Sequence, residues 1–329
     1  MAQLTMAKAL NAGLANAMAG DDKVVMLGQD IGRLGGVFRV TDGLQQRFGA
    51  KRVMDSPLAE AGIVGTAIGM AMRGYRTVCE IQFDGFVFPA YDQIVNQAAK
   101  LRSRSRGAVT APIVIRVPCG GGIGAIEHHA ESPEAHFAPV PGLRMVTPSN
   151  PADAYWMIQQ AIESPDPVLF FEPKRQYHSG RGEVDPEAPL SAAPARLDQA
   201  AVLRPGELVT LVGFGPTIST LLKAADLLAE EGRSAEVIDL RSLAPVDYAT
   251  LEASARKTGR VIVVHEAPRT SGIGAEIAAK LSEECFYSLE APVMRVTGLD
   301  MPYPPSKVEE EYLPNLDRVL DGVDRILRY

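Results

Sequence analysis

The chain has 329 residues, enough for about two domains that each bury a core of their own. Its 46% hydrophobic and 22% charged residues are typical of a soluble globular protein, and the net charge of −7 argues against a nucleic-acid partner. The three cysteines, Cys79, Cys119 and Cys285, are widely spaced, and no apolar run reaches the length of a membrane span. We therefore expect a cytoplasmic protein with no disulfide framework and no membrane contact.

Short apolar runs alternate with helical patterns along the first half of the chain. A helix from Thr5 to about Met18 precedes the first run, which spans 24–28. The other elements expected here are strands at 77–83, 113–117, 145–148 and 168–171, and helices that end near Phe48 and that span 89–102 and 151–163. This alternation predicts a mostly parallel, doubly wound α/β sheet.

A further helix is predicted over 55–73, because its first residues, Asp-Ser-Pro, are capping and first-turn types. Gly62, Gly65 and Gly69 share one face of this helix, at a cost of roughly 1 kcal/mol each relative to alanine. Such a smooth face is useful where another backbone or a flat ligand comes close. Glu60 lies beside it, one turn into the predicted helix. The alternative is that Glu60 is a carboxylate favoured only by the helix dipole.

The composition changes between Tyr177 and Pro205, where glycines and prolines punctuate a polar segment without periodicity. We interpret residues 181–205 as a linker between a first domain, 1–180, and a second domain, 206–329. In the second domain, strands are expected at 208–213, 235–240, 260–265 and 292–297, and helices at 217–231, 247–257, 273–286 and 315–328. The second domain is therefore also predicted to be α/β.

The most prominent candidate site is a glycine run followed by paired histidines. The run Gly120–Gly124 contains no Gly-Lys-Ser/Thr and no complete G-x-G-x-x-G, so we expect it to turn the backbone tightly near a ligand. His128 and His129 follow among three nearby glutamates, a setting typical of a proton donor or acceptor near neutral pH. A metal cluster is the alternative, although adjacent residues diverge and the spacing matches no standard site.

Two pairs of polar residues lie at predicted strand ends, where open α/β sheets bind ligands: Gln29-Asp30 and His265-Glu266. Gly213-Phe214-Gly215-Pro216 is superficially similar to a nucleotide-binding turn, but the third glycine is missing and Pro216 removes an N–H. We interpret it as a structural turn.

Taken together, these stretches closely resemble the beta subunit of the thiamin-diphosphate-dependent decarboxylase component of 2-oxo acid dehydrogenase complexes. The resemblance covers essentially the whole chain and implies a transketolase-like pyrimidine-binding domain followed by a transketolase C-terminal domain. The motifs that carry it are residues 35–41 (GGVFRVT), 56–65 (SPLAEAGIVG), 88–94 (FPAYDQI), 129–135 (HAESPEA), 170–174 (FFEPK), 264–266 (VHE) and 272–278 (GIGAEIA).

The resemblance assigns roles to individual residues. Glu60 matches the family glutamate that hydrogen-bonds N1′ of the cofactor's aminopyrimidine and so favours its imino tautomer. Phe86 matches an aromatic residue that packs on the pyrimidine ring, with core packing as the alternative. His129, and not His128, matches the histidine thought to assist proton transfer and reductive acylation of the lipoyl group. Gln29 stands where the family usually has a glutamate near the cofactor.

Two metal ions follow from the resemblance. Magnesium bridges the cofactor's diphosphate in this superfamily through a Gly-Asp-Gly motif, which this chain lacks. The diphosphate and Mg²⁺ are therefore expected on an alpha subunit, in an α2β2 heterotetramer. A structural K⁺ is the second ion, and its main-chain carbonyl ligands would come from Ile113, Ala161, Ile162, Ser164 and Asp166.

We therefore predict an oxidoreductase subunit that acts with an alpha subunit and a lipoyl acyltransferase core on a 2-oxo acid. Residues 56–58 and 170–174 favour a branched-chain 2-oxo acid, with a pyruvate or acetoin dehydrogenase beta subunit as the alternative. A non-catalytic docking subunit would tolerate loss of Glu60 and His129, yet both are present. A dinucleotide-binding oxidoreductase needs a glycine fingerprint that the chain lacks.

Overall fold

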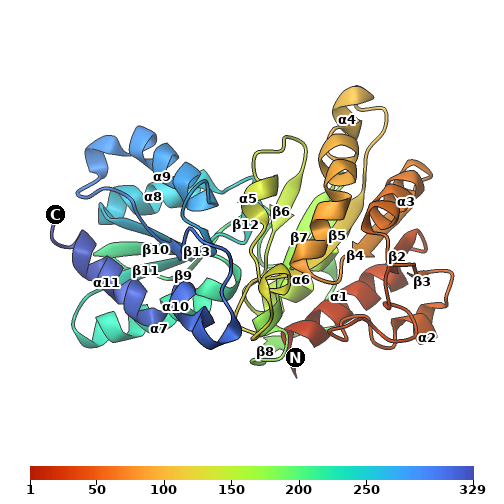
Figure 1. Ribbon diagram of the computed structural model, residues 1–329, viewed down its shortest axis with the longest axis horizontal. Coiled ribbons are helices and arrows are strands. Elements are labelled where there is room, and N and C mark those ends of the chain that lie inside the picture. Colours follow the sequence, from red (N-terminus) through yellow and green to blue (C-terminus); the bar gives the residue numbers. More distant parts are fainter. The chain divides into compact units, whose positions relative to one another are not determined.

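The computed structural model describes residues 1–329 and divides into two compact units (Figure 1). Unit 1 comprises Met1–Cys119 and Pro139–Leu197, and unit 2 comprises Gly120–Ala138 and Asp198–Tyr329. The segment Gly120–Ala138 directly follows a strand of unit 1, yet it packs with unit 2. This segment, which contains the paired histidines, is called the histidine loop below.

The sheet of unit 1 consists of parallel strands in the order β6-β7-β5-β4-β2-β3. Most of their residues are buried, which explains why the sequence shows short apolar runs without alternation. The strands are β2 (Val24–Gly28), β3 (Val53–Asp55), β4 (Arg76–Glu80), β5 (Ile113–Cys119), β6 (Arg144–Val146) and β7 (Val168–Pro173).

Helices α1 (Met6–Gly20) and α6 (Pro151–Glu163) lie side by side in unit 1 (Figure 1). Gly13 permits the contact, since a Cβ there would lie 2.6 Å from the Ile158 side chain. Thr5 caps α1, since its hydroxyl accepts the Lys8 N–H. The remaining helical segments of unit 1 are α2 (Leu44–Phe48), α3 (Glu60–Met72), η1 (Asp84–Ala90), η2 (Gln93–Ala98), α4 (Leu101–Arg104), η4 (Lys174–Gln176) and η5 (Leu190–Ala192).

Two details of the predicted helices in unit 1 are wrong. Val53–Asp55 form strand β3, paired with β2, so α3 begins at Glu60 and not at Asp55. Asp55 caps no helix, and its carboxylate accepts the Gly32 N–H at 2.7 Å. The predicted helix 89–102 is split into the 3₁₀ turn η1, the π-helical η2 and the short α4. Pro89 lies inside η1 and cannot donate the hydrogen bond that a continuous α-helix requires.

Unit 2 has its own mostly parallel sheet, in the order β14-β13-β10-β11-β9, with β9 antiparallel to β11. Its strands are β9 (Ala201–Arg204), β10 (Val209–Gly213), β11 (Ala235–Asp239), β13 (Val261–Pro268) and β14 (Met294–Gly298), and β12 (Ser242–Ala244) is a further short strand. Its helical segments are η3 (Glu127–His129), α5 (Glu134–Phe137), η6 (Gly215–Thr217), α7 (Ile218–Glu230), α8 (Tyr248–Thr258), α9 (Ile273–Glu284), η7 (Phe286–Ser288), η8 (Ser306–Val308), α10 (Glu309–Tyr312) and α11 (Leu316–Ile326). The predicted α/β fold is confirmed in both units.

Residues 181–205 contain ordered elements. Strand β8 (Gly182–Val184) pairs antiparallel with β1 (Ala2–Leu4) in unit 1, and β9 joins the sheet of unit 2. Leu197 is buried in the core that α1 and α6 share. None of the helices combines the length and the apolar content that a membrane crossing needs.

Candidate functional site

Three of the candidate residues follow neighbouring strands of unit 1. Gln29 comes directly after β2, Glu60 lies a few residues after β3, and Phe86 follows β4 in η1. These strands are adjacent and parallel, so their carboxyl ends meet at one edge of the sheet, where open α/β sheets bind ligands. Helix α3, which begins with Glu60, also packs against η1. The structure therefore brings Gln29, Glu60 and Phe86 to the same edge.

Glu60 is a buried carboxylate without a partner. It is the first residue of the 13-residue helix α3, and only 9% of its surface is exposed. The chain provides it with no hydrogen bond and no ion pair. The positive end of the helix dipole favours a negative charge at this position. Since buried charged groups normally have partners, Glu60 has the features of a residue that binds something outside this chain.

Phe86 is held in place by its own turn. Asp84 and Lys174 form a fully buried ion pair that fixes the start of η1. Phe83 packs edge-to-face against Phe86, with ring centroids 6.1 Å apart. Phe86 itself is half-buried, so part of its ring is exposed to solvent. The core-packing alternative for Phe86 therefore accounts for only part of its surface.

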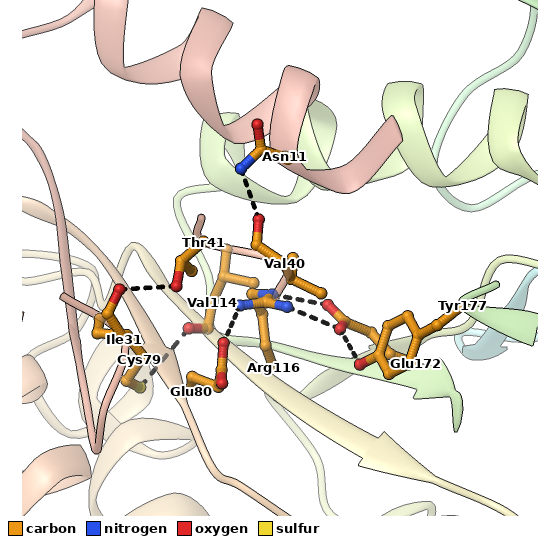
Figure 2. Close-up of polar contacts among 10 residues, drawn as sticks. All are labelled: Asn11, Ile31, Val40, Thr41, Cys79, Glu80, Val114, Arg116, Glu172 and Tyr177. Atoms are coloured by element: carbon orange, nitrogen blue, oxygen red, sulfur yellow. Dashed lines mark hydrogen bonds and ion pairs between the residues drawn. The ribbon is translucent and has the colours of Figure 1, made fainter. Parts of the chain in front are cut away.

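Hydrogen bonds hold the segment 30–41, which follows Gln29, in place. Asp30 adopts a left-handed φ of 58°, and its carboxylate accepts a hydrogen bond from the Gln82 side chain at 3.1 Å. Further along, the Thr41 hydroxyl donates to the Ile31 carbonyl at 2.7 Å, and Asn11 donates to the Val40 carbonyl (Figure 2). The half-buried Gln29 thus lies between strand β2 and a segment that these hydrogen bonds hold in place.

A buried charge network lies beneath this edge (Figure 2). Arg116 on β5 contacts Glu80 at the end of β4 and Glu172 on β7, and Tyr177 donates its hydroxyl to Glu172. Burial raises the pKa of Glu80, while the adjacent Arg116 lowers it in opposition. A Cβ at Gly36 would lie 3.2 Å from the Glu80 carboxylate, so the network lies close against the segment after Gln29.

His129 belongs to unit 2, in the 3₁₀ turn η3 of the histidine loop. Its N–H donates to the Ile126 carbonyl at 2.9 Å, and its ring packs edge-to-face on His128 at 4.3 Å. His128 and His129 are both half-buried. The glycine run before them turns tightly, as predicted, with φ of 84° at Gly120 and 82° at Gly122. No group of three or more histidine, cysteine or acidic side chains has the arrangement of a metal site.

His265 is a core residue. It is fully buried, its Nδ1 hydrogen-bonds the Ala267 carbonyl, and burial lowers its pKa to about 4. A Cβ at Gly272 or Gly274 would lie within 3 Å of the imidazole ring, which accounts for both glycines. His265 is therefore neutral near pH 7, and the adjacent Glu266 contacts the histidine loop.

The five residues with proposed carbonyl ligands lie at the opposite, amino-terminal edge of the unit 1 sheet. Ile113 begins β5, and the other four surround the end of α6, just before β7. The last carbonyls of a helix lack intrahelical partners and carry the negative end of its dipole, so the setting suits a cation. Arg76 already donates to the Ile162 carbonyl at 2.8 Å, and Ser164 donates to the Asp166 carbonyl at 2.9 Å.

Comparison with known proteins identifies both units. Residues 2–179 match the transketolase pyrimidine-binding domain, and residues 198–319 match the transketolase C-terminal domain. The chain is 59% identical to the pyruvate dehydrogenase E1 component subunit beta of Leifsonia xyli subsp. xyli, over 99% of this chain and 95% of that protein. The chain belongs to the family of 2-oxo acid dehydrogenase E1 beta subunits.

Relatives in this family carry both pyruvate and branched-chain names. The 3-methyl-2-oxobutanoate dehydrogenase subunit beta of Mycobacterium tuberculosis is 51% identical over 99% of this chain and 92% of that protein. The 2-oxoisovalerate dehydrogenase subunit beta of Pseudomonas aeruginosa is 46% identical over 98% of this chain and 95% of that protein. The predicted family is therefore confirmed, and both substrate classes are represented in it.

A solved structure shares the fold. It is titled a split gene transketolase, inactive beta4 tetramer, and it matches with a TM-score of 0.80 and 24% identity over 99% of each chain. At this identity the likeness concerns the fold alone. It confirms the transketolase-like arrangement of two α/β domains.

The sequence analysis did not identify the buried charge network of Arg116, Glu80 and Glu172 that lies next to the site. Arg116 is the one charged residue in the apolar run 113–117, and this was the available signal, because a charge in a buried strand requires a partner. Its partners Glu80 and Glu172 are far away in sequence, so the pattern alone could not identify them.

Proposed function

We propose that this chain is the catalytic beta subunit that binds the aminopyrimidine half of thiamin diphosphate and, with an alpha subunit, oxidatively decarboxylates a 2-oxo acid. The observation that carries the proposal is Glu60: a buried carboxylate without a partner, at the carboxyl edge of the sheet in a pyrimidine-binding domain. A non-catalytic docking subunit would not need to keep such a costly group.

Glu60 is proposed to accept a hydrogen bond from the protonated N1′ of the aminopyrimidine. Its buried position makes that contact strong, because water competes little there. When bound, thiamin diphosphate supplies the carbanion that attacks the 2-oxo carbon and the electron sink that remains when carbon dioxide leaves. Phe86 is proposed to cover one face of the pyrimidine, and Gln29 to face the cofactor with a neutral amide where the family usually has an acid.

His129 is proposed to act later, when the acyl group passes to a lipoyl group. The lipoyl disulfide opens in that step, and the leaving sulfur needs a proton. The half-buried imidazole of His129 is a suitable proton donor for this step. His129 is thus a proton donor for acyl transfer, while Glu60 serves decarboxylation.

The partners follow from what this chain lacks. It contains no Gly-Asp-Gly motif and no acidic cluster that could hold a metal ion. We propose that the alpha subunit holds Mg²⁺ and the diphosphate in an α2β2 heterotetramer, which delivers the acyl group to a lipoyl acyltransferase core. The relatives are named as beta subunits, which implies an alpha partner.

A structural K⁺ is proposed at the carbonyls of Ile113, Ala161, Ile162, Ser164 and Asp166. The carbonyls at the end of α6 support it, because they carry the negative end of the helix dipole. The contact from Arg76 to the Ile162 carbonyl uses one of that oxygen's two lone pairs, and the other remains available. Such an ion would stiffen the starts of β5 and β7, far from Glu60 along the strands.

The proposed substrate is a branched-chain 2-oxo acid. The sequence of residues 170–174 (FFEPK) and the 51% identical Mycobacterium tuberculosis relative support this choice. Pyruvate is the second candidate, favoured by the 59% identical Leifsonia xyli relative.

Reconstitution with an alpha subunit tests the proposal. The assembled enzyme is assayed with thiamin diphosphate on pyruvate and on the 2-oxo acids of valine, leucine and isoleucine. We expect turnover that requires both chains, with the highest kcat/KM on a branched-chain acid. Highest kcat/KM on pyruvate would overturn the substrate choice, and no decarboxylation of any 2-oxo acid would overturn the function.

A further inference from the structure

The histidine loop is held by polar side chains that have no role in the proposed function. The Gly121 N–H donates to Glu266 at 3.0 Å, and the Gly124 N–H donates to Glu309 at 3.0 Å. Between them, the Gly122 N–H lies 3.3 Å from both Glu309 and the Tyr303 hydroxyl. These contacts come from three separate positions of unit 2: the end of β13, the start of α10, and the segment between β14 and η8.

The contacts form one connected unit. The Tyr303 hydroxyl donates to Glu309 at 2.8 Å, so the two side chains hold each other in place. Glu266, Tyr303 and Glu309 are buried, with exposed fractions of 4%, 6% and 9%. Consecutive backbone N–H groups in a glycine turn form a cradle that binds anions. Here the cradle is filled by the protein's own carboxylates, so the run Gly120–Gly124 serves to anchor a loop and not to bind phosphate.

The glycines are required by this arrangement. A Cβ at Gly121 would lie 2.1 Å from the Tyr303 hydroxyl, and a Cβ at Gly120 would lie 2.9 Å from the Glu266 carboxylate. Gly120, Gly122 and Gly124 also have positive φ, which side chains rarely adopt. Backbone and side chains therefore fit together only if Gly120 and Gly121 carry no side chain.

The anchored turn continues directly into the histidines. Ala125 and Ala130, on either side of η3, pack against the cluster that contains Tyr303, Tyr312 and Leu313. The Gly120 N–H donates to the Glu131 carbonyl at 2.9 Å, which closes the base of the loop. The backbone that carries His129 is thus fixed before it, behind it and across its base.

We propose that Glu266, Tyr303 and Glu309 are positioning residues, which fix the histidine loop so that His129 meets the lipoyl group in acyl transfer. The inference rests on the proposed function of His129. It adds residues of the second domain to the acyl-transfer step, although they contact neither substrate nor cofactor. Removing one of them frees the loop without removing the imidazole.

The test uses three variants in the assembled enzyme. Glu309→Ala removes both acceptors, Glu309→Gln keeps one, and Tyr303→Phe removes a single hydroxyl in case the first two fail to fold. Tyr312→Phe is the matched control, because Tyr312 packs on Tyr303 at 5.0 Å but its hydroxyl makes no hydrogen bond to the loop. Hydrogen exchange of the peptide that contains residues 119–131 reports on the anchor itself, independently of activity.

Two activities separate positioning from general damage. Decarboxylation is measured with an artificial electron acceptor, and acyl transfer is measured with lipoamide. We expect Glu309→Ala to speed exchange of the loop amides and to slow acyl transfer by about tenfold or more, while decarboxylation stays within about threefold. Glu309→Gln and Tyr303→Phe should show smaller effects of the same kind, and Tyr312→Phe none.

The possible outcomes distinguish the inference from the function beneath it. Unchanged exchange in Glu309→Ala and Tyr303→Phe would show that the carboxylates do not hold the loop, which overturns the inference. Faster exchange with unchanged acyl transfer, or an equal loss of both activities, would overturn it as well. Failure of the proposed function would appear elsewhere, as full acyl transfer by His129→Ala in an otherwise wild-type loop.

Discussion

Arg116 binds Glu172 through two parallel hydrogen bonds, Nε to Oε1 and Nη2 to Oε2, both 2.7 Å long, inside the unit 1 sheet. Both side chains are essentially inaccessible to water, with exposed fractions of 1% and 0%. The remaining guanidinium nitrogen contacts Glu80. One cation thus joins three adjacent strands directly beneath the edge where Gln29, Glu60 and Phe86 lie.

Arg116→Met should therefore destabilise unit 1 strongly. The substitution leaves Glu80 and Glu172 buried without a cation, which typically costs about 3–5 kcal/mol. Urea denaturation measures the free energy of unfolding. Arg325→Met is the control, because its ion pair with Asp321 is exposed and contributes less than about 1 kcal/mol. A loss as small as the control's would show that the network does not stabilise the fold.

Glu134 should make stability depend on pH. Burial, and then the nearby Glu266, raises the pKa of Glu134 to about 7 from the model-compound value of 4.5. Between these values the folded chain binds a proton that the unfolded chain has lost. Stability from this group is therefore complete below about pH 4.5 and falls as pH rises through 7, by about 3 kcal/mol in all.

Glu134→Gln should remove this dependence. We expect the difference in unfolding free energy, variant minus wild type, to shift in favour of the variant by about 3 kcal/mol between pH 4.5 and pH 8. Glu127→Gln, on the exposed part of the same loop, is the control: hydrogen bonds from its own backbone N–H and from His128 lower the pKa of Glu127, so no shift in the variant's favour is expected. A difference that stays constant with pH would mean that Glu134 titrates normally.

His129 should matter for acyl transfer more than for decarboxylation. His129→Ala is expected to slow acylation of lipoamide by about a hundredfold or more, since it removes the proposed proton donor. His128→Ala is the natural control, because its ring lies only 4.3 Å from that of His129. If His128→Ala proved the more damaging of the two variants in the lipoamide assay, the role would pass to His128.

The isolated chain should not bind thiamin diphosphate tightly. In the proposed site it contributes Glu60 and Phe86 toward the pyrimidine, and it has no group of acidic side chains arranged to hold the metal that bridges the diphosphate. Calorimetry with Mg²⁺ and thiamin diphosphate, with and without the alpha subunit, measures the difference. Tight, magnesium-dependent binding by this chain alone would contradict the division of the cofactor site between two subunits.

The sequence predicted the two sheets well, because buried parallel strands leave an unambiguous pattern of short apolar runs between helices. It failed at β3, where only three residues form the strand and the capping types that follow it suggested a helix start. It correctly placed Gln29 and Phe86 after strands, so their shared edge follows from topology once the strand order is known, whereas the strand before Glu60 was missed.

Long-range polar contacts could not be predicted in this way. Gly124 and Glu309 are 185 residues apart, and no local pattern connects a glycine turn to a glutamate at that distance. In the sequence, the histidine loop directly follows a strand of unit 1. In the structure it belongs to unit 2, where its alanines pack against Tyr303, Tyr312 and Leu313. The sequence therefore identified the histidines of the loop but not the side chains that hold the loop in place.

Glu60→Gln in the assembled enzyme tests the central claim most directly. The variant keeps the shape of the side chain but removes the charge that favours a protonated N1′, so we expect decarboxylation to fall by about a hundredfold or more with the fold intact. Glu163→Gln, an exposed acid of α6 in unit 1, should retain wild-type rates. Decarboxylation by Glu60→Gln within a few-fold of wild type would contradict the role of Glu60 and, with it, the proposed site.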